Sequence, residues 1–241
     1  MSHSETDRLL KGQRRYYAAR APEYDQWWER GGRYDRGEAE NQVWFEEVAQ
    51  LERLVDEAEL NGDVPELAGG TGNWTVRLAQ KASRLTVLDA SLEMIDRNRR
   101  RIRETAADCP VEYQQTDLFA WHPEREYDAV FLGFWLSHVP VESLSEFLNH
   151  VATAVRPGGK LVIVDSRRQA LSSSPDQPPP AEGVERSDRV LNDGRRFEIV
   201  KRYFTPEELH FQLAPRGFAV EANSTATHFV HGVATKQATS R

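Results

Sequence analysis

A short turn with the sequence ELAGGTG, residues 66–72, has the composition of a ligand-binding loop. Glycine has no Cβ, so the backbone of such a turn can approach a ligand closely. Two acids follow it along the chain: Asp89 closes the apolar run RLTVLD, and Asp117 follows VEYQQT. Carboxylates accept hydrogen bonds from hydroxyl and amino groups, and the free amides at a helix start attract anions. These residue types predict a pocket for a polar small molecule.

The elements around these residues alternate between strand and helix patterns, which predicts a parallel sheet with helices on both faces. In such a sheet the ligand crevice lies at the carboxyl ends of the strands, so the turn, Asp89 and Asp117 are expected to converge there. The expected strands are DVPELAG, RLTVLDAS, VEYQQTDLF, the start of YDAVFLGFWLSHV, and RPGGKLVIVDS. The expected helices are NWTVRLAQKA, LEMIDRNRRRIRETA and VESLSEFLNHVATAV.

The first 60 residues predict a helical cap on this core, which we expect to span residues 61–241 within a single domain. Aromatic side chains crowd the stretch from residue 16 to residue 34, and Pro22 and a glycine pair divide it into two helical pieces. Such a segment can act as a mobile lid that excludes water from a pocket. A fixed cap that packs on the sheet edge is the alternative.

The C-terminal part adds a loop, a helix and a terminal strand pair. Residues 171–195 are rich in proline and serine, so we expect a loop there, inserted on the substrate side of the pocket. RRFEIVKRYF is a candidate added strand. Thr205 and Glu208 have the spacing of a capping box at the start of the last helix, and FAVEANSTATHFVHGVAT predicts two antiparallel strands.

Composition excludes several classes of function. The chain has 241 residues, a formal charge of −7 and one cysteine, Cys109. The negative balance gives no sign of a nucleic-acid partner, and no run approaches the ~18 apolar residues of a membrane helix. A single cysteine predicts no internal disulfide and no cysteine-based metal cluster, and we expect no metal. The polar N-terminus lacks the apolar core of a signal peptide, so we expect a cytoplasmic protein.

The glycine turn by itself leaves two cofactors open. Gly70-Thr71-Gly72, followed by Asp89, has the approximate spacing of a dinucleotide site. Thr75 argues against that interpretation, because a dinucleotide turn has glycine or alanine at this third position. The turn has no Walker lysine, so a phosphate loop is excluded.

The alternative is S-adenosylmethionine (SAM). ELAGGTG resembles the acid-x-Gly-x-Gly-x-Gly motif of class I SAM-dependent methyltransferases, and VLDAS, TDLF, YDAVFLGFWLSHV and RPGGKLVIVD follow in the order of that family. The resemblance covers roughly residues 60–165. Ala68 departs from it, standing where the family often has its first glycine. YYAARAPEYDQWW also resembles a subgroup of small bacterial methyltransferases.

The resemblance implies a Rossmann-like α/β fold with a seven-stranded sheet, mostly parallel with an antiparallel last strand. It implies that SAM is the cofactor and S-adenosylhomocysteine (SAH) the product. Glu66 would then lie near the methionyl end, Asp89 would hold the ribose hydroxyls, and Asp117 would accept from the adenine amino group. The full set of implied cofactor-binding residues is Tyr24, Glu66, Ala68, Gly69, Gly70, Gly72, Asp89, Ala90, Met94, Asp117, Leu118 and Phe134.

The acceptor is expected to be a small organic molecule, methylated on oxygen, nitrogen, sulfur or carbon. His138 is a candidate general base and Trp135 a candidate aromatic wall, with structural roles as the alternatives. Tyr16 and Trp28 complete the expected substrate-binding set with these two. Four arginines flank the 171–195 loop, either for an acidic substrate or as a solvated face. They are Arg167, Arg168, Arg195 and Arg196.

Other functions remain open from sequence. A SAM-binding protein that is not a transferase, either pericyclase-like or regulatory, would keep the same cofactor residues. A nicotinamide-dependent oxidoreductase is less favoured because of Thr75. We expect no nucleic-acid or membrane partner, and a monomer or a homodimer.

Overall fold

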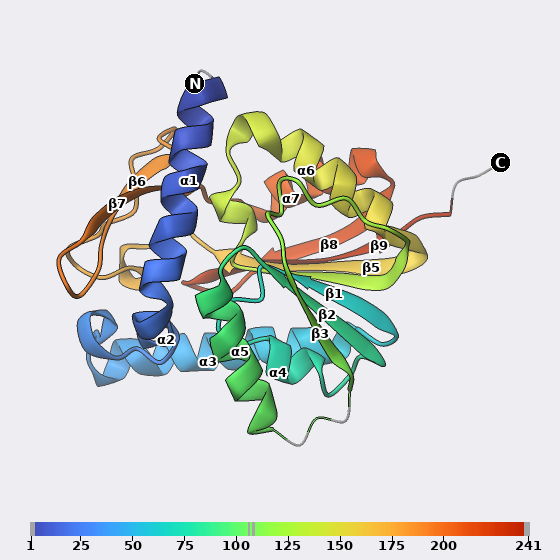
Figure 1. Ribbon diagram of the computed structural model, residues 1–241, viewed down its shortest axis with the longest axis horizontal. Coiled ribbons are helices and arrows are strands. Elements are labelled where there is room, and N and C mark those ends of the chain that lie inside the picture. Colours follow the sequence, from blue (N-terminus) through green and yellow to red (C-terminus); the bar gives the residue numbers. More distant parts are fainter. Residues whose placement is uncertain (1–2, 106, 108, 239–241) are drawn as a thin grey trace.

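The computed structural model describes residues 3–105, 107 and 109–238. At its centre is a seven-stranded sheet with the order β3-β2-β1-β4-β5-β9-β8 (Figure 1). Only β9 runs antiparallel to its neighbours β5 and β8, so the mostly parallel sheet expected from the sequence is confirmed. The strands are β1 Asp63–Leu67, β2 Arg84–Asp89, β3 Val111–Gln115, β4 Tyr127–Gly133, β5 Val155–Ser166, β8 Phe218–Ser224 and β9 Phe229–Lys236.

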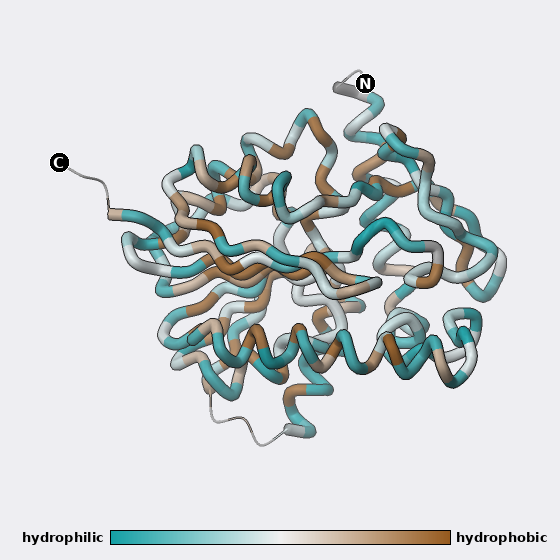
Figure 2. The backbone as a smooth tube through the Cα atoms, turned by 180° about the vertical axis from the view of Figure 1, so that it is seen from behind, coloured by the Kyte–Doolittle hydropathy of each residue, from teal (hydrophilic) through white to brown (hydrophobic). Residues whose placement is uncertain are grey.

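Helices cover both faces of the sheet, as Figure 1 shows. On one face α6 and α7 bury leucines and a phenylalanine against β4 and β5. On the other face α3 and α4 pack around Trp44, which is fully buried. Figure 2 shows the hydrophobic stretches concentrated in the central strands, whereas the helices alternate between hydrophobic and hydrophilic residues. The helices are α3 Glu38–Glu57, α4 Thr75–Leu78, α5 Leu92–Arg103, α6 Val141–Ala154 and α7 Pro206–Leu213.

The N-terminal segment forms the expected helical pieces. They are α1 His3–Arg20, η1 Ala21–Glu23, α2 Asp25–Trp28 and η2 Gly32–Tyr34. The long helix ends just before Pro22, which lies in the following 3-10 turn, and Gly32 adopts a positive φ of 57° at the second break. Helix α1 packs against strand β7, so the cap is attached to the C-terminal half of the chain as well as to the sheet.

The segment expected as a loop between residues 171 and 195 contains a strand, which corrects the sequence expectation. Residues Arg186–Val190 form β6 and pair antiparallel with β7, Arg196–Val200, in a separate two-stranded sheet. The sequence RSDRV has almost no strand-forming residues, so its conformation depends on tertiary packing. Tyr16 of α1 packs against Ile199 and Leu191 of this hairpin.

Two other local expectations differ in outcome. The capping box is confirmed: the Thr205 hydroxyl accepts from the Glu208 amide, and the Glu208 carboxylate accepts from the Thr205 amide. The helix expected over NWTVRLAQKA is shorter, since α4 covers four residues and the rest forms turns. No helix in the described part of the chain is long and apolar enough to cross a membrane.

Candidate cofactor and acceptor site

The glycine turn after β1 is held from behind by buried polar contacts. Glu66 is 2% exposed and accepts a 2.5 Å hydrogen bond from the Thr75 hydroxyl. Asn98 of α5 donates to that hydroxyl at 2.7 Å and to the Gly69 carbonyl at 3.3 Å. A Cβ at Gly69 would lie 2.4 Å from a methyl group of Val87, so this position accepts only glycine without rearrangement.

The position where the family motif often has glycine is strained here. Ala68 has a φ of +61°, in the left-handed region that non-glycine residues rarely adopt. Gly70 and Gly72 have positive φ values of 54° and 95°, which glycine tolerates. Gly72 faces Asn98 rather than a cavity, since a Cβ there would lie 3.0 Å from the Asn98 side chain.

Asp89, at the end of β2, connects the turn to the start of α5. Its carboxylate accepts from the Gly70 amide and from the Ser91 amide, both at 2.9 Å. Burial raises the pKa of Asp89 to about 6, even though these hydrogen bonds favour the charged form. The remaining acceptor capacity of its two oxygens faces a cavity.

Asp117, after β3, is bonded to the cap. Its carboxylate accepts from Arg14 of α1 at 2.6 Å and from the Phe119 amide at 3.2 Å. Sequence reasoning missed Arg14, because nothing in the local sequence of α1 links it to a residue 103 positions away.

A cavity, which we call the Asp89 cavity, lies between the strand ends and the cap. It brings together the expected ribose and adenine residues and five residues of the cap. It is lined by Leu10, Gln13, Arg14, Tyr17, Tyr24, Ala68, Gly70, Asp89, Ala90, Ser91, Met94, Asp117, Leu118, Phe119, Gly133, Phe134, Trp135 and His138.

A second, smaller cavity, which we call the Glu66 cavity, continues along the glycine turn. Three tryptophans form its walls around the Glu66 carboxyl, and the buried Nε1 of Trp74 has no hydrogen-bond partner among the described residues. Burial raises the pKa of Glu66 to about 8. It is lined by Tyr24, Trp27, Trp28, Glu66, Ala68, Gly69, Gly70, Thr71, Asn73, Trp74, Gly133 and Phe134.

A third cavity lies between the cap and the β6–β7 hairpin, and we call it the Lys201 cavity. Its lining includes Arg20, Arg189 and Lys201 and contains no aspartate or glutamate. The other lining residues are Tyr17, Tyr24, Trp27, Tyr34, Phe134, His138, Ser166, Ser172, Ser173, Ser174, Gln177, Ile199 and Tyr203.

The three cations of the Lys201 cavity differ in their partners, since Lys201 pairs with Asp165 and also donates to the Ser137 hydroxyl at 2.8 Å. Lys201 is 8% exposed, and its nearest carboxylate is Asp165 at 3.7 Å. Arg189 is 9% exposed and donates to the Ser187 hydroxyl and the Asp188 carbonyl, while Arg20 lies over tyrosine rings. Among the described residues neither arginine has a carboxylate partner. A guanidinium group without a carboxylate partner can hold an anion through charge-assisted hydrogen bonds.

Two residues line all three cavities and mark the point where they meet. They are Tyr24 of the cap and Phe134, directly after β4. Phe134 is held in the left-handed region with a φ of +56°, and its amide donates to the Val164 carbonyl at 2.8 Å. Backbone strain of this kind in a bulky residue is concentrated at functional sites.

The residues predicted to contact substrate are distributed differently from the expectation. His138 lines both the Asp89 and the Lys201 cavities, but Trp135 lines only the first. Trp28 lines the Glu66 cavity. Tyr16 lies outside all three, buried against the hairpin at 1% exposure, because its position on α1 faces β7.

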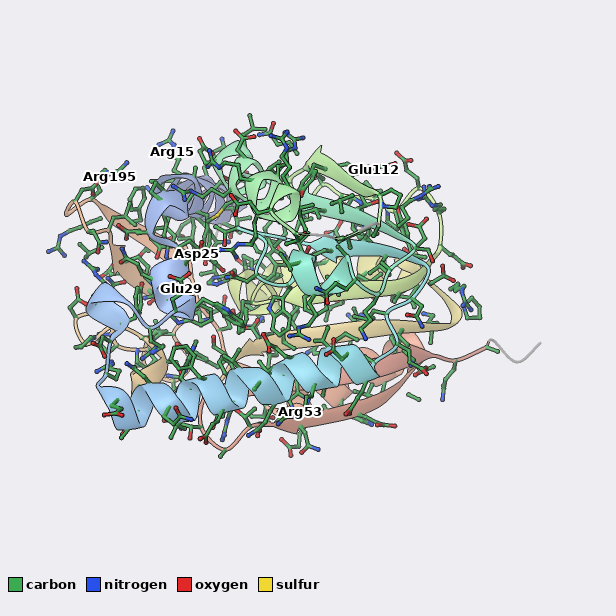
Figure 3. All side chains as sticks on the ribbon, turned by 90° about the horizontal axis from the view of Figure 1, so that it is seen from below. Arg15, Asp25, Glu29, Arg53, Glu112 and Arg195 are labelled. Carbon is green, nitrogen blue, oxygen red and sulfur yellow. The ribbon has the colours of Figure 1, made fainter. Side chains whose placement is uncertain are left out.

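The flanking arginines named from the sequence do not line the Lys201 cavity. Arg167 and Arg168 donate to backbone carbonyls, and Arg195 is exposed at the hairpin tip beside Asp193 (Figure 3). The cavity instead takes its cations from α1 and from the hairpin, where the sequence carries no motif.

Comparison with known proteins agrees with this geometry. A family model described as a methyltransferase domain matches residues 64–159. The solved DhpI–SAM–HEP complex is 35% identical with a TM-score of 0.75, covering 97% of this chain and 99% of that chain. With this coverage and these strand-end residues, the chain belongs to the class I SAM-dependent methyltransferases.

Two curated relatives match the core alone. Carboxy-S-adenosyl-L-methionine synthase of Erwinia tasmaniensis is 34% identical over 96 residues, 39% of each chain. Trans-aconitate 2-methyltransferase of Azoarcus sp. is 33% identical over 104 residues, 42% of this chain and 37% of that protein. The chain thus spans well under half the length of either relative.

The residues present fit SAM. The Asp89 carboxylate can accept from a diol, and Asp117, Met94 and Leu118 line the same cavity. Glu66 lies among aromatic walls, an environment suited to an ammonium group. In the described part of the chain there is no cluster of three or more residues suited to a metal ion.

Proposed function

We propose that this protein transfers the methyl group of SAM to a small acidic molecule bound in the Lys201 cavity, on an ionised oxygen of that molecule. The observation that carries the proposal is the cavity itself, with three cations and no carboxylate in its lining. Arginine and lysine side chains form strong charge-assisted hydrogen bonds with carboxylate and phosphate groups. The cavity meets both cofactor-side cavities at Tyr24 and Phe134.

The chemistry needs little from the protein beyond orientation. SAM supplies a methyl group on a cationic sulfonium, and displacement by an oxygen requires the two atoms to be held in line. Arg20, Arg189 and Lys201 would hold the anion, and the aromatic walls would exclude water. An oxygen that is already ionised at neutral pH requires no general base, so the reaction would release SAH and a neutral or less charged ester.

The surroundings of His138 support a reaction without a base. Its Nδ1 lies 2.7 Å from the Val200 carbonyl oxygen and its Nε2 lies 2.8 Å from the Tyr17 hydroxyl, so both ring nitrogens are engaged. Burial and the nearby Lys201 hold the pKa of His138 well below its ordinary value. We therefore propose a structural role for His138 in place of the general-base role suggested by the sequence.

The name of one curated relative agrees with an acidic acceptor. One curated relative acts on trans-aconitate by its name, and that substrate is an anion. The cationic cavity of this chain agrees with an acidic acceptor, although the match to that relative covers only the core.

The experiment is methyl transfer from labelled SAM to a panel of small carboxylates and phosphates, each paired with its neutral amide or ester. We expect acids to be methylated and their neutral partners not. Replacing Lys201 by Met or Arg189 by Gln should lower kcat/KM at least tenfold, because each removes a charge-assisted hydrogen bond. Arg195→Gln, which removes an exposed cation outside the cavity, is the matched control and should have no effect.

Methylation of the neutral partners with equal efficiency would overturn the acidic acceptor. Mass analysis of the cofactor in the same reactions tests the alternative of a non-transferase. Formation of a modified SAM in place of SAH would show that the protein acts on the cofactor itself.

A further inference from the structure

Tyr17 of α1 stands between the cofactor side and the acceptor side of the site. It lines the Asp89 cavity and the Lys201 cavity, and its hydroxyl lies 2.8 Å from Nε2 and 3.4 Å from Nδ1 of His138, so the shorter contact is with Nε2. No other described residue has a hydrogen bond to that hydroxyl. Arg20 follows one turn later on the same helix, so the two side chains project from one face into the Lys201 cavity.

The direction of the Tyr17–His138 hydrogen bond is fixed by a third group. The Val200 carbonyl oxygen, 2.7 Å from Nδ1 of His138, can only accept, so Nδ1 must carry the proton. A neutral imidazole then has a bare lone pair on Nε2, and the Tyr17 hydroxyl must donate to it. The Tyr17 oxygen is left with acceptor capacity only.

The environment of the imidazole favours its neutral form, in which this order holds. His138 is 6% exposed, and burial together with the positive charge of Lys201 keeps its pKa well below the ordinary value. Arg189 and Arg20 act in the same direction, while the Val200 hydrogen bond opposes them. The ring therefore stays neutral across the physiological range, and the Tyr17 oxygen remains an acceptor.

Resting on the proposed function, we propose that Tyr17 selects acceptors that carry an O–H or N–H group beside the anionic group. The cations of the cavity all donate, so they recognise the anion and cannot recognise a donor. The Tyr17 oxygen supplies an acceptor one helical turn from Arg20, where it can bind a donor that lies beside the anion. A small hydroxy acid or amino acid fits both groups at once, whereas a plain acid leaves the Tyr17 oxygen without a partner.

Tyr17 acts here as a positioning residue. If it removed a proton from the acceptor, its own proton would have to pass to Nε2 of His138, where burial and Lys201 disfavour a charge. The hydrogen bond instead orients the acceptor so that the ionised oxygen faces the junction of the cavities. Loss of the hydrogen bond should therefore change discrimination between acceptors and leave the shape of the pH profile unchanged.

The first test measures the proton positions directly. Nitrogen-15 NMR shifts of His138 in the SAH complex should show a neutral ring with the proton on Nδ1 between pH 6 and pH 8. A proton on Nε2, or a titration of the ring within that range, would overturn the assignment.

The second test uses matched acids on the SAH-loaded protein: glycolate with acetate, lactate with propionate, and glycerol 3-phosphate with propyl phosphate. For each pair that binds, calorimetry should show that the wild type binds the hydroxy acid about three- to tenfold more tightly than the plain acid. This is the range expected for one hydrogen bond. In Tyr17→Phe that preference should disappear while affinity for the plain acid is retained. Tyr203→Phe, in the same cavity, should change both members of a pair alike.

Three results would contradict the proposal. Equal affinity for both members in the wild type would remove the selection, and an undiminished preference in Tyr17→Phe would place it elsewhere. Weaker SAH binding by Tyr17→Phe with no change in preference would assign the hydroxyl to the cofactor. If none of the acids binds, the proposed function fails and this selection with it, while the nitrogen shifts still report whether the Tyr17–His138 arrangement exists.

Discussion

Glu66 accepts a 2.5 Å hydrogen bond from Thr75 at the back of the glycine turn, and among the described residues no cation accompanies its carboxyl group. Burial raises the pKa of Glu66 to about 8, the Thr75 hydrogen bond opposes this, and the charge of Asp89 adds to it. Glu66 is therefore largely protonated at pH 7 in the absence of SAM. An ammonium group placed nearby would favour the charged form.

We predict that SAM binding at pH 7 releases a proton from Glu66. Calorimetric titrations in buffers of different ionisation enthalpy should report this release, and SAM affinity should rise between pH 6 and pH 7.5. Glu66→Gln should bind SAM more weakly, release fewer protons on binding and lose this pH dependence. Proton release that is identical in wild type and variant would place the methionyl end elsewhere.

Lys201 gives acceptor binding a different pH dependence. Burial lowers the pKa of Lys201 to about 8, with Asp165 opposing the shift. The side chain is cationic below that pH and neutral above it, so acceptor affinity should fall as the pH rises through about 8 and beyond. Acceptor KM measured from pH 7 to pH 9.5 should rise in the wild type and stay flat, at a higher value, in Lys201→Met. If the acceptor KM rises with pH as steeply in the variant as in the wild type, the pH dependence does not come from Lys201.

Ala68 carries strain that glycine would relieve. A left-handed conformation costs an L-residue about 1–2 kcal/mol, so Ala68→Gly should stabilise the fold by about 1 kcal/mol. For a chain of this length that corresponds to about 2–4 °C in Tm. Ala49→Gly, in the middle of α3, should lower Tm because glycine is unfavourable inside a helix. A lower Tm for Ala68→Gly would show that its methyl group makes packing contacts that outweigh the strain.

The cap is fastened to the glycine turn at Asp25. Its carboxylate accepts from the Thr71 hydroxyl at 2.5 Å and from Arg101 at 2.8 Å, and Figure 3 shows it on α2. We predict that residues 12–36 form a lid with lower local stability than the sheet. Amide exchange there should be fast in the free protein and slow with SAM or SAH bound.

Asp25→Asn should weaken this attachment and speed SAH release by about tenfold, the effect of losing roughly one charge-assisted hydrogen bond. Glu29→Gln, on the same segment but exposed, is the control and should match the wild type. Slow exchange across residues 12–36 that ligand does not change would identify the segment as a fixed cap.

The sequence predicted the sheet because strand and helix patterns are local. The glycine turn, Asp89 and Asp117 could be placed together because parallel strands bring their carboxyl ends to one edge. Trp135, Trp28 and Tyr16 could not be assigned to a cavity, since that depends on which face of an element meets its neighbour. The cytoplasmic location and the oligomeric state stay predictions.

The cationic residues of the Lys201 cavity could not be predicted from the sequence. Arg189 lies on a strand whose sequence does not favour a strand, and it reaches the cavity only because the hairpin packs on α1. Lys201 follows the same hairpin, and Arg20 comes from the cap. The arginines that flank the 171–195 loop were the visible candidates, but sequence proximity to a pocket does not determine where a long side chain points.

The most direct test of the account is a crystal structure of the protein with SAH and a small acid that it methylates. We expect the SAH sulfur beside Tyr24 and Phe134 and the ribose on Asp89. We expect the acid on Arg20, Arg189 and Lys201, with one oxygen facing the sulfur. An acid bound outside the Lys201 cavity, or a sulfur directed away from it, would contradict the central claim.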